Sequence, residues 1–314
     1  MKRFSTAAGR ADLDGPGHAA YHAGMYELTV RVDKSLSGRS VRAAALGRLQ
    51  VSYGQLKRIK FSGGQILVDG CPRRSNYLLR EGETLTLRFP EDEGPSLWPG
   101  EKPVSLAYED ADYLIADKPA PLPSVASRQG GETLENRVFS YLGCPENFIY
   151  RPVNRLDKGT SGLMLVAKNA HAQQLAQSLL HTDAFVREYL AVVKGRLPET
   201  EGCIDLAIGH GPGIRRVIDR AGQSALTEYR VLREGEGGSL VGLRLRTGRT
   251  HQIRVHMAAI GCPVLGDFLY GEEDPRLPGR FALHSARLFL RHPLSGQPVE
   301  ALSPLPEELQ ELMM

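Results

Sequence analysis

The sequence lacks the features that would place the protein in a membrane or in a disulfide-rich class. Its longest apolar runs, such as Leu163–Ala167, are far shorter than the roughly 20 residues that a membrane-spanning helix needs. Residues 1–24 carry charges where a signal peptide would have an apolar core. The four cysteines are scattered singly, without a C-x-x-C pair. We therefore expect a cytoplasmic protein without a membrane span, with reduced, structural thiols.

The usual motifs of nucleotide and metal chemistry are also missing. The glycine cluster Gly209–Gly213 has neither the strand-to-helix setting nor the lysine of a phosphate-binding loop. His251 and His256 are five residues apart, so they do not share one helical face, and no carboxylate stands between them. We therefore expect no bound metal and no cofactor.

A strong net charge is absent as well. The sequence contains 39 Lys and Arg and 36 Asp and Glu, which gives a net charge of +3. This value alone does not indicate a nucleic-acid partner. The distribution is more informative, because twelve basic residues and only four acidic ones lie between Arg31 and Arg88. The basic charge is therefore concentrated near the N-terminus.

A chain of 314 residues with 41 % hydrophobic residues is long enough for a small and a large folded unit. The first reads as an α+β module, with strands expected at Leu28–Val32, Gln65–Val68 and Thr84–Phe89. Between Val41 and Ile59, apolar residues recur at roughly helical spacing and predict two helices with one basic side. This side includes Arg42, Arg58 and Lys60.

The runs Ile66–Gly70 and Leu79–Leu85 resemble the alpha-L RNA-binding module, which is named after a protein of the small ribosomal subunit. The resemblance implies that Arg42, Arg58 and Lys60 contact structured RNA. The alternative is an ordinary solvated helix face, as most charged runs are.

The segment Pro90–Pro103 is acidic and rich in Pro and Gly, which predicts a stiff connection between the two units. We therefore expect a flexible arm at 1–24, the module at 25–90, a linker at 91–103 and a larger domain at 104–314. Trp98 is expected to anchor the linker on that domain.

The larger domain alternates strand-like and helix-like segments. Thr250 is expected to cap one of the helices, and both His171 and His181 are expected at the surface. Strands are predicted at Asp112–Pro119, Leu163–Ala167, Phe185–Gly195 and Leu243–Arg246, and helices at Glu132–Leu142, Ala170–Leu180 and from Thr250 to Ile260.

Asp157 is the first candidate for chemistry. It lies on a polar turn between Val153 and the strand-like Leu163–Ala167, together with Arg155 and Lys158. Loops between regular elements often carry catalytic groups. The alternative is structural, because an Asp close to Gly and Thr commonly forms a turn with its own backbone.

The strings Asn154–Asp157 and Gly159–Leu163 closely resemble the signature of the RluA-type pseudouridine synthases, which are RNA-modifying isomerases. Further stretches at Asp112–Pro119, Phe185–Gly195 and Leu243–Gly266 are similar to the same family in order and spacing. The resemblance covers roughly 101–290. It implies an α+β fold with a mixed, mostly antiparallel sheet, flanking helices and a central basic cleft.

The resemblance also assigns roles to residues of this chain. It implies that Asp157 is the catalytic carboxylate, that Arg254 pairs with it, and that Tyr189 is a base or proton relay. Packing in the core is the alternative for Tyr189, and a surface salt bridge is the alternative for Arg254. The remaining substrate contacts implied are Arg155, Arg249 and, in the uracil pocket, Leu283. The family usually has His where this chain has Asn154, which leaves the contact of that His without an equivalent.

Conversion of uridine to pseudouridine breaks the N-glycosidic bond, rotates the uracil and rejoins it through carbon. Because this is an isomerisation, it requires no cofactor. We expect structured RNA as the partner, with ribosomal RNA first and transfer RNA second, and a monomeric enzyme. Two other functions stay open: a non-catalytic RNA-binding or ribosome-assembly factor, and a glycosidic-bond hydrolase. The hydrolase generally needs a second carboxylate or a metal, and neither is evident.

Overall fold

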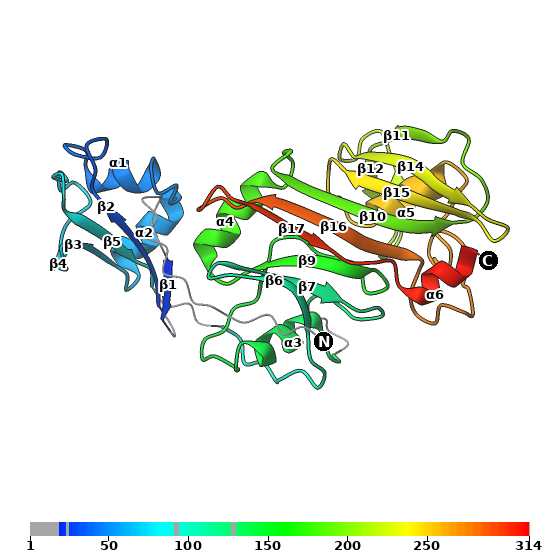
Figure 1. Ribbon diagram of the computed structural model, residues 1–314, viewed down its shortest axis with the longest axis horizontal. Coiled ribbons are helices and arrows are strands. Elements are labelled where there is room, and N and C mark those ends of the chain that lie inside the picture. Colours follow the sequence, from blue (N-terminus) through cyan, green and yellow to red (C-terminus); the bar gives the residue numbers. More distant parts are fainter. Residues whose placement is uncertain (1–18, 23–24, 91–93, 127–129, 314) are drawn as a thin grey trace, which may run out of the picture. The chain divides into compact units, whose positions relative to one another are not determined.

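The computed structural model describes residues 19–22, 25–90, 94–126 and 130–313. The chain divides into two compact units with a boundary after Pro90, and the short segment Tyr21–Tyr26 groups with the larger, C-terminal unit (Figure 1). The expected flexible arm at 1–24 lies outside the described residues except at its end. There Ala19–His22 form strand β1, so this part of the arm is a strand.

The N-terminal unit is a five-stranded sheet with two helices. The strand order is β1-β2-β5-β3-β4. The three expected strands are confirmed to within three residues at each end, and the two expected helices are both present. The elements are β2 (Met25–Arg31), α1 (Val41–Leu46), α2 (Tyr53–Phe61), β3 (Gln65–Val68), β4 (Cys71–Pro72) and β5 (Thr84–Arg88).

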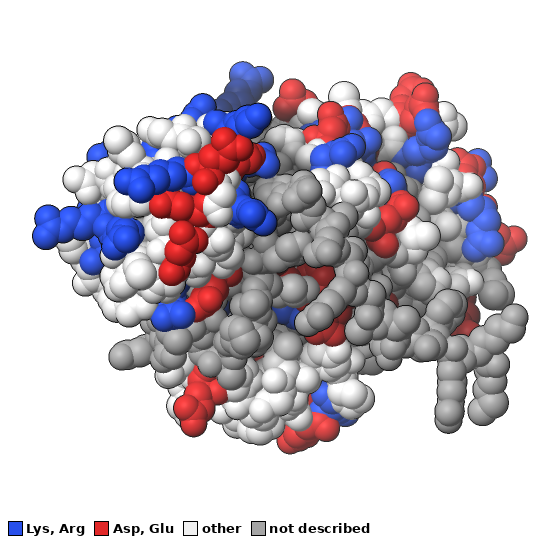
Figure 2. All heavy atoms as spheres, turned by 60° about the vertical axis from the view of Figure 1, so that its left-hand side comes forward, with Lys and Arg blue, Asp and Glu red and all other residues white. Residues whose placement is uncertain are grey.

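The second helix of this unit begins at a capping box. The Oγ of Ser52 accepts a hydrogen bond from the backbone N–H of Gln55, and the Gln55 side chain accepts one from the Ser52 N–H. Leu56 and Ile59 on α2 are buried. Because Arg42, Arg58 and Lys60 are all exposed, the basic side predicted for the helices faces solvent. Figure 2, which brings this unit forward, shows Lys and Arg side chains spread over its surface with acidic side chains between them.

The larger unit is built on a ten-stranded sheet, with order β11-β14-β15-β10-β16-β9-β7-β6 along the main path. Strand β8 pairs with β9, and β17 pairs with β16. The strands are β6 (Ser105–Glu109), β7 (Tyr113–Lys118), β8 (Arg151–Pro152), β9 (Ser161–Ala167), β10 (Phe185–Val193), β11 (Glu201–Asp205), β14 (Leu226–Glu234), β15 (Ser239–Leu245), β16 (Leu283–Arg291) and β17 (Pro298–Leu302). A separate pair consists of β12 (Ile208–His210) and β13 (Arg216–Ile218).

Strands β9 and β16 pair in parallel, while the other pairings described for this sheet are antiparallel. The helices are α3 (Leu134–Tyr141), α4 (Ala170–Leu179), α5 (Gln252–Ala259) and α6 (Glu307–Gln310), followed by the 3-10 turn Glu311–Met313. The expected α+β class with a mixed, mostly antiparallel sheet is therefore confirmed.

The central strands β7 and β9 are buried on both faces of the sheet. Along β9, Met164 and Val166 belong to one hydrophobic cluster, whereas Leu163 and Leu165 belong to another. Successive side chains of a strand point to opposite faces, so each face packs against its own core. This explains why Leu163–Ala167 is a continuous apolar run and does not alternate.

Several expectations need correction. His171 is fully buried, although it was expected at the surface; His181 is exposed. Helix α5 is not capped by Thr250, because its N-cap is His251, which has a left-handed backbone and makes no capping hydrogen bond. Trp98 is 55 % exposed, so its side chain does not anchor the linker. Backbone groups hold the linker instead, among them the Trp98 carbonyl, which accepts a hydrogen bond from Asn136 at 2.8 Å.

The cysteines carry no disulfide among the described residues, and Cys262 is the buried one. Because Cys71, Cys144 and Cys203 are exposed, a structural role in packing applies only to Cys262. Within the described part of the chain, no helix is long and apolar enough to span a membrane.

Candidate active site

Asp157 lies on the turn that joins β8 to β9. The turn is closed by a backbone hydrogen bond from the Thr160 N–H to the Asp157 carbonyl at 3.1 Å. Gly162 follows with φ of +103°, and a Cβ there would stand 2.3 Å from the carbonyl oxygen of Ser285. Only glycine allows this conformation and this approach. The turn is thereby set at the end of the parallel β9–β16 pair.

Asn154 fixes the start of the same turn. Its Oδ1 accepts a hydrogen bond from the backbone N–H of Leu165 at 2.9 Å, and the residue is buried. Asn154, where the resemblance predicts His, therefore has a structural role here, since it gives a buried N–H of β9 an acceptor.

Lys118, at the end of β7, supports the turn from another side. Its Nζ donates to the carbonyls of Leu122, Pro119 and Lys158 at 2.7, 3.1 and 3.4 Å. The side chain is fully buried, and this burial lowers the pKa of Lys118 to about 7. Lys118 therefore connects the loop after β7 to the residue next to Asp157.

Arg254, on the buried face of α5, is the direct partner of Asp157. Its Nη1 donates to Asp157 Oδ2 at 2.9 Å. Its other edge donates twice to the fully buried Asp267, from Nε at 2.7 Å and from Nη2 at 2.8 Å. The guanidinium also lies 4.0 Å from the ring centroid of Phe281. That ring can come so close to the turn because residue 159 is glycine. The Cβ of any other residue at this position would stand 2.7 Å from the ring.

His251 lies beside the same carboxylate. Its Nε2 is 3.9 Å from Asp157 Oδ2, and its Nδ1 is 2.8 Å from the hydroxyl of Tyr270. Burial lowers the pKa of His251. The imidazole is therefore neutral near pH 7, and the positive charge in contact with Asp157 belongs to Arg254.

Tyr189 projects from β10 into the same region and is 6 % exposed. Burial raises the pKa of Tyr189, and the charge of Asp157 acts in the same direction; the positive charge of Arg187 and a hydrogen bond with Ser285 lower it. The phenol is therefore protonated at neutral pH.

These side chains meet in a cleft of about 640 Å³, whose walls include Arg155, Asp157, Arg187, Tyr189 and Arg249. An adjoining recess is lined by Asp157 and Tyr189 again and also by Arg254 and Leu283. The six site residues expected in this unit are thus brought together. Arg42, Arg58 and Lys60 belong to the N-terminal unit and are exposed there.

Contributors that were not foreseen from the sequence include Lys118, Arg187 and Asp267. A signal existed for Arg187, because it lies two residues before Tyr189 on a strand and therefore points to the same face. Asp267 and Lys118 have no comparable local signal. Within the described residues, no group of three His, Cys, Asp or Glu side chains is arranged to hold a metal ion.

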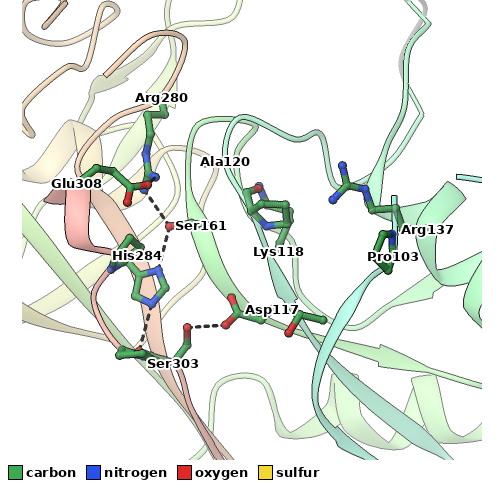
Figure 3. Close-up of a pocket in the computed structure, with 14 residues that line it drawn as sticks. Pro103, Asp117, Lys118, Ala120, Arg137, Ser161, Arg280, His284, Ser303 and Glu308 are labelled. Carbon is green, nitrogen blue, oxygen red and sulfur yellow. Dashed lines mark hydrogen bonds and ion pairs between the residues drawn. The ribbon is translucent and has the colours of Figure 1, made fainter. Parts of the chain in front are cut away.

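A second cavity, of about 370 Å³, shares no lining residue with the cleft (Figure 3). Ser161 lies between Arg280 and His284 there, with its Oγ accepting from Arg280 Nη2 at 3.0 Å and lying 2.9 Å from His284 Nδ1. Its two arginines already have carboxylate partners, since Arg280 pairs with Glu308 and Arg137 with Glu132. This cavity lies beside Lys118 and contains part of the framework behind the Asp157 turn.

Comparison with known proteins agrees with this geometry. Residues 112–259 match the family of RNA pseudouridylate synthases. An uncharacterized RNA pseudouridine synthase, YjbO of Bacillus subtilis, is 36 % identical over 272 residues, which cover 85 % of this chain and 96 % of the relative. The ribosomal large subunit pseudouridine synthase D of Xanthomonas campestris is 34 % identical to this chain. The match covers 90 % of this chain and 93 % of that relative.

A solved structure, that of the human RNA pseudouridylate synthase domain containing 1, superimposes with a TM-score of 0.54 and 30 % sequence identity. The match covers 66 % of this chain and 86 % of the human one. Sequence relatives, fold and family match therefore agree, and the chain belongs to the RNA pseudouridine synthases, in their RluA-type family.

Proposed function

We propose that this pseudouridine synthase isomerises specific uridines in structured RNA of the large ribosomal subunit, without a cofactor and with Asp157 as the catalytic carboxylate. The observation that supports this most is the contact of Asp157 with Arg254 in a recess that Tyr189 and Leu283 also line. A carboxylate can act as a nucleophile or as a base.

In this proposal Arg254 directs Asp157 at the ribose through their ion pair. Its own orientation is set by Asp267 and by the Phe281 ring, so the charge is preorganised before the substrate enters. Asp157 then either attacks the sugar carbon or abstracts a sugar proton; both routes break the bond between the ribose C1′ and N1 of the uracil, and the uracil leaves with the bonding electrons. Rotation of the uracil and bond formation at carbon give an isomer, in which nothing is oxidised or hydrolysed.

The last step removes the proton from the new carbon bond, and we assign it to Tyr189. Because burial raises the pKa of Tyr189, the phenol acts as a base only when an ionised intermediate or a neighbouring cation helps it. Arg187 is such a cation, since its charge lowers the pKa of Tyr189.

The uridine has to leave the RNA helix to reach Asp157, which costs a few kcal/mol. Arg155 is exposed at the cleft, where its planar guanidinium can stack in the vacated space. Leu283 is buried in the recess and offers an apolar contact to the uracil. Arg249, in the cleft, and the basic helices of the N-terminal unit contribute phosphate contacts in this proposal.

The choice of ribosomal RNA is supported by relatives that are named ribosomal large subunit pseudouridine synthase D. Transfer RNA is the alternative substrate. The test is a map of pseudouridines in total RNA from cells that have or lack the gene, and from deleted cells that express Asp157→Asn.

We expect a small set of large-subunit sites to disappear on deletion and to return with the wild-type protein but not with Asp157→Asn. If the sites that disappear lie in transfer RNA, the proposed substrate is wrong and the proposed reaction still holds. An unchanged map in all RNA, with RNA binding intact, would contradict the proposal in favour of a binding or assembly factor. Release of free uracil would favour a hydrolase.

A further inference from the structure

Arg187 is a buried cation in the substrate cleft with no carboxylate partner in the part of the chain that the structure describes. It is 5 % exposed, and it lines the cleft with Asp157 and Tyr189. Its Nη2 donates to the carbonyl of Leu180 at 3.0 Å, but its Nε has no hydrogen-bond partner within the described residues. A guanidinium that is removed from water and left without a counter-charge is costly, unless a ligand supplies the anion.

Asn154 contributes a second buried donor to the same cleft. Its Oδ1 is committed to the Leu165 N–H, and this contact fixes the amide orientation, because a flipped amide would bring two donors together. The Nδ2 then has no acceptor among the residues described. Asn154 is 7 % exposed and, like Arg187, lines the cleft.

The charge of the cleft favours an anion. Its lining includes the cations Arg155, Lys158, Arg187 and Arg249 and a single carboxylate, Asp157. That carboxylate is already bound by Arg254. Arg187 and Tyr189 lie two residues apart on β10, so their side chains leave the same face of the sheet roughly 7 Å apart.

We propose that Arg187 and Asn154 form a subsite for a phosphodiester of the RNA strand, next to the nucleotide whose uracil occupies the Asp157 recess. The subsite rests on the proposed function, since it specifies how that substrate is held. A phosphate brings the negative charge that Arg187 lacks, and its two free oxygens accept from Nε of Arg187 and from Nδ2 of Asn154. Both atoms are buried in the structure, so these contacts require a shift of the two side chains toward the phosphate. The uracil carbonyls are neutral and do not supply that charge.

The first measurement uses inorganic phosphate as the probe and needs no turnover. Binding is followed by the rise in melting temperature of the wild type, Arg187→Gln, Asn154→Asp and a control, Arg230→Gln. Arg230 is an exposed arginine of the same unit, 71 % exposed and paired with Glu201. Asn154→Asp keeps the acceptor for Leu165 but replaces the free amide N–H with a negative oxygen. The general stabilising effect of phosphate salts raises the melting temperature of all four proteins equally, so only the differences between them report on the subsite.

We expect phosphate binding to weaken about tenfold or more in Arg187→Gln and Asn154→Asp and to be unchanged in Arg230→Gln. Circular dichroism shows whether each variant is folded. Arg187→Lys, which keeps the charge but loses the planar fork, should fall between the wild type and Arg187→Gln.

The second measurement uses the RNA that carries the mapped uridine, made with a single uncharged methylphosphonate at each phosphate flanking it. We expect one position at which this change weakens binding about tenfold for the wild type and for Arg230→Gln, and less than about twofold for Arg187→Gln. If no position distinguishes the wild type from Arg187→Gln, the proposed subsite is wrong. Where the phosphate measurement and the methylphosphonate measurement disagree, the methylphosphonate measurement decides.

The two proposals fail separately. An enzyme that forms pseudouridine normally but shows neither effect overturns the subsite and leaves the proposed function intact. A protein that shows the phosphate difference but modifies no RNA keeps the subsite and loses the proposed function.

Discussion

Asp267 holds Arg254 along one whole edge of its guanidinium, through two hydrogen bonds of 2.7 and 2.8 Å. Only Nη1 is left to reach Asp157. Both Arg254 and Asp267 are almost completely buried, with side-chain exposures of 4 % and 0 %. The direction in which Arg254 presents its charge to Asp157 is therefore decided by a residue that lines neither the cleft nor the recess.

We predict that Asp267→Asn lowers kcat about 10- to 100-fold, because Arg254 loses its fixed orientation. The free energy of unfolding should fall by roughly 3 kcal/mol, since a buried ion pair is broken from one side. Single-turnover rates, RNA affinity and urea unfolding measure the three effects, and RNA affinity should not change. Asp274→Asn is the control, because its partner Arg276 is largely exposed and such pairs contribute little. Equal effects in the two variants would contradict the positioning role.

Asp157→Asn tests the carboxylate itself. We expect turnover to fall by at least about a thousandfold, as for the loss of other essential catalytic groups. RNA binding should persist or strengthen slightly, because one negative charge leaves a basic cleft. Asp205→Asn, at an exposed position of β11, is the matched control. Residual activity in Asp157→Asn close to that of the control would remove the carboxylate from the mechanism.

Tyr189→Phe removes only a hydroxyl from a buried ring. We predict a loss of about 100-fold or more in the rate of pseudouridine formation, the usual range for a general base. Tyr113→Phe is a suitable control, because Tyr113 is fully buried in the same sheet and its hydroxyl donates to the Ala172 carbonyl at 2.8 Å. The control should lose about 1 kcal/mol of stability and no activity. A fully active Tyr189→Phe enzyme would assign the last proton to another group.

The strands and helices that position the site could be predicted because their signals are local. The run Leu163–Ala167, the alternation around Tyr189 and the helical spacing before Ile59 each report the burial of their own neighbourhood. The meeting of Asp157, Tyr189 and Arg254 is not local, since 97 residues separate the two partners of the ion pair. It was predicted from the family resemblance, and the cleft supports it.

Asp267 and the order of the sheet could not be predicted from the sequence. An Asp followed by Phe and Leu in a glycine-flanked turn has the appearance of a turn residue, and it does accept the backbone N–H groups of Leu269 and Tyr270. Its bond to Arg254 depends on how α5 packs against that turn. Likewise, β10 pairs with β15 and β16, and no local pattern specifies partners so distant in sequence.

Lys118 predicts a pH dependence of stability. Burial lowers the pKa of Lys118 from its ordinary 10.5 to about 7. Between these two values the unfolded chain binds a proton that the folded protein has released, so the free energy of unfolding rises with pH across this window, by about 1.4 kcal/mol per unit. Below pH 7 both states are protonated, and the folded state bears the whole cost of the buried charge.

Lys118→Met removes this contribution, so the stability of the wild type relative to Lys118→Met should increase from pH 7 to about pH 9 and be constant below pH 7. Urea unfolding at several pH values measures the difference, and NMR of the lysine side chain follows the titration directly. Lys194→Met, at an exposed lysine paired with Glu272, should show no such trend. If the difference in unfolding free energy between the wild type and Lys118→Met does not change with pH, the carbonyls of Pro119, Leu122 and Lys158 keep the ammonium charged. The loop beside Asp157 would then be held by a permanent cation, and its position would be independent of pH.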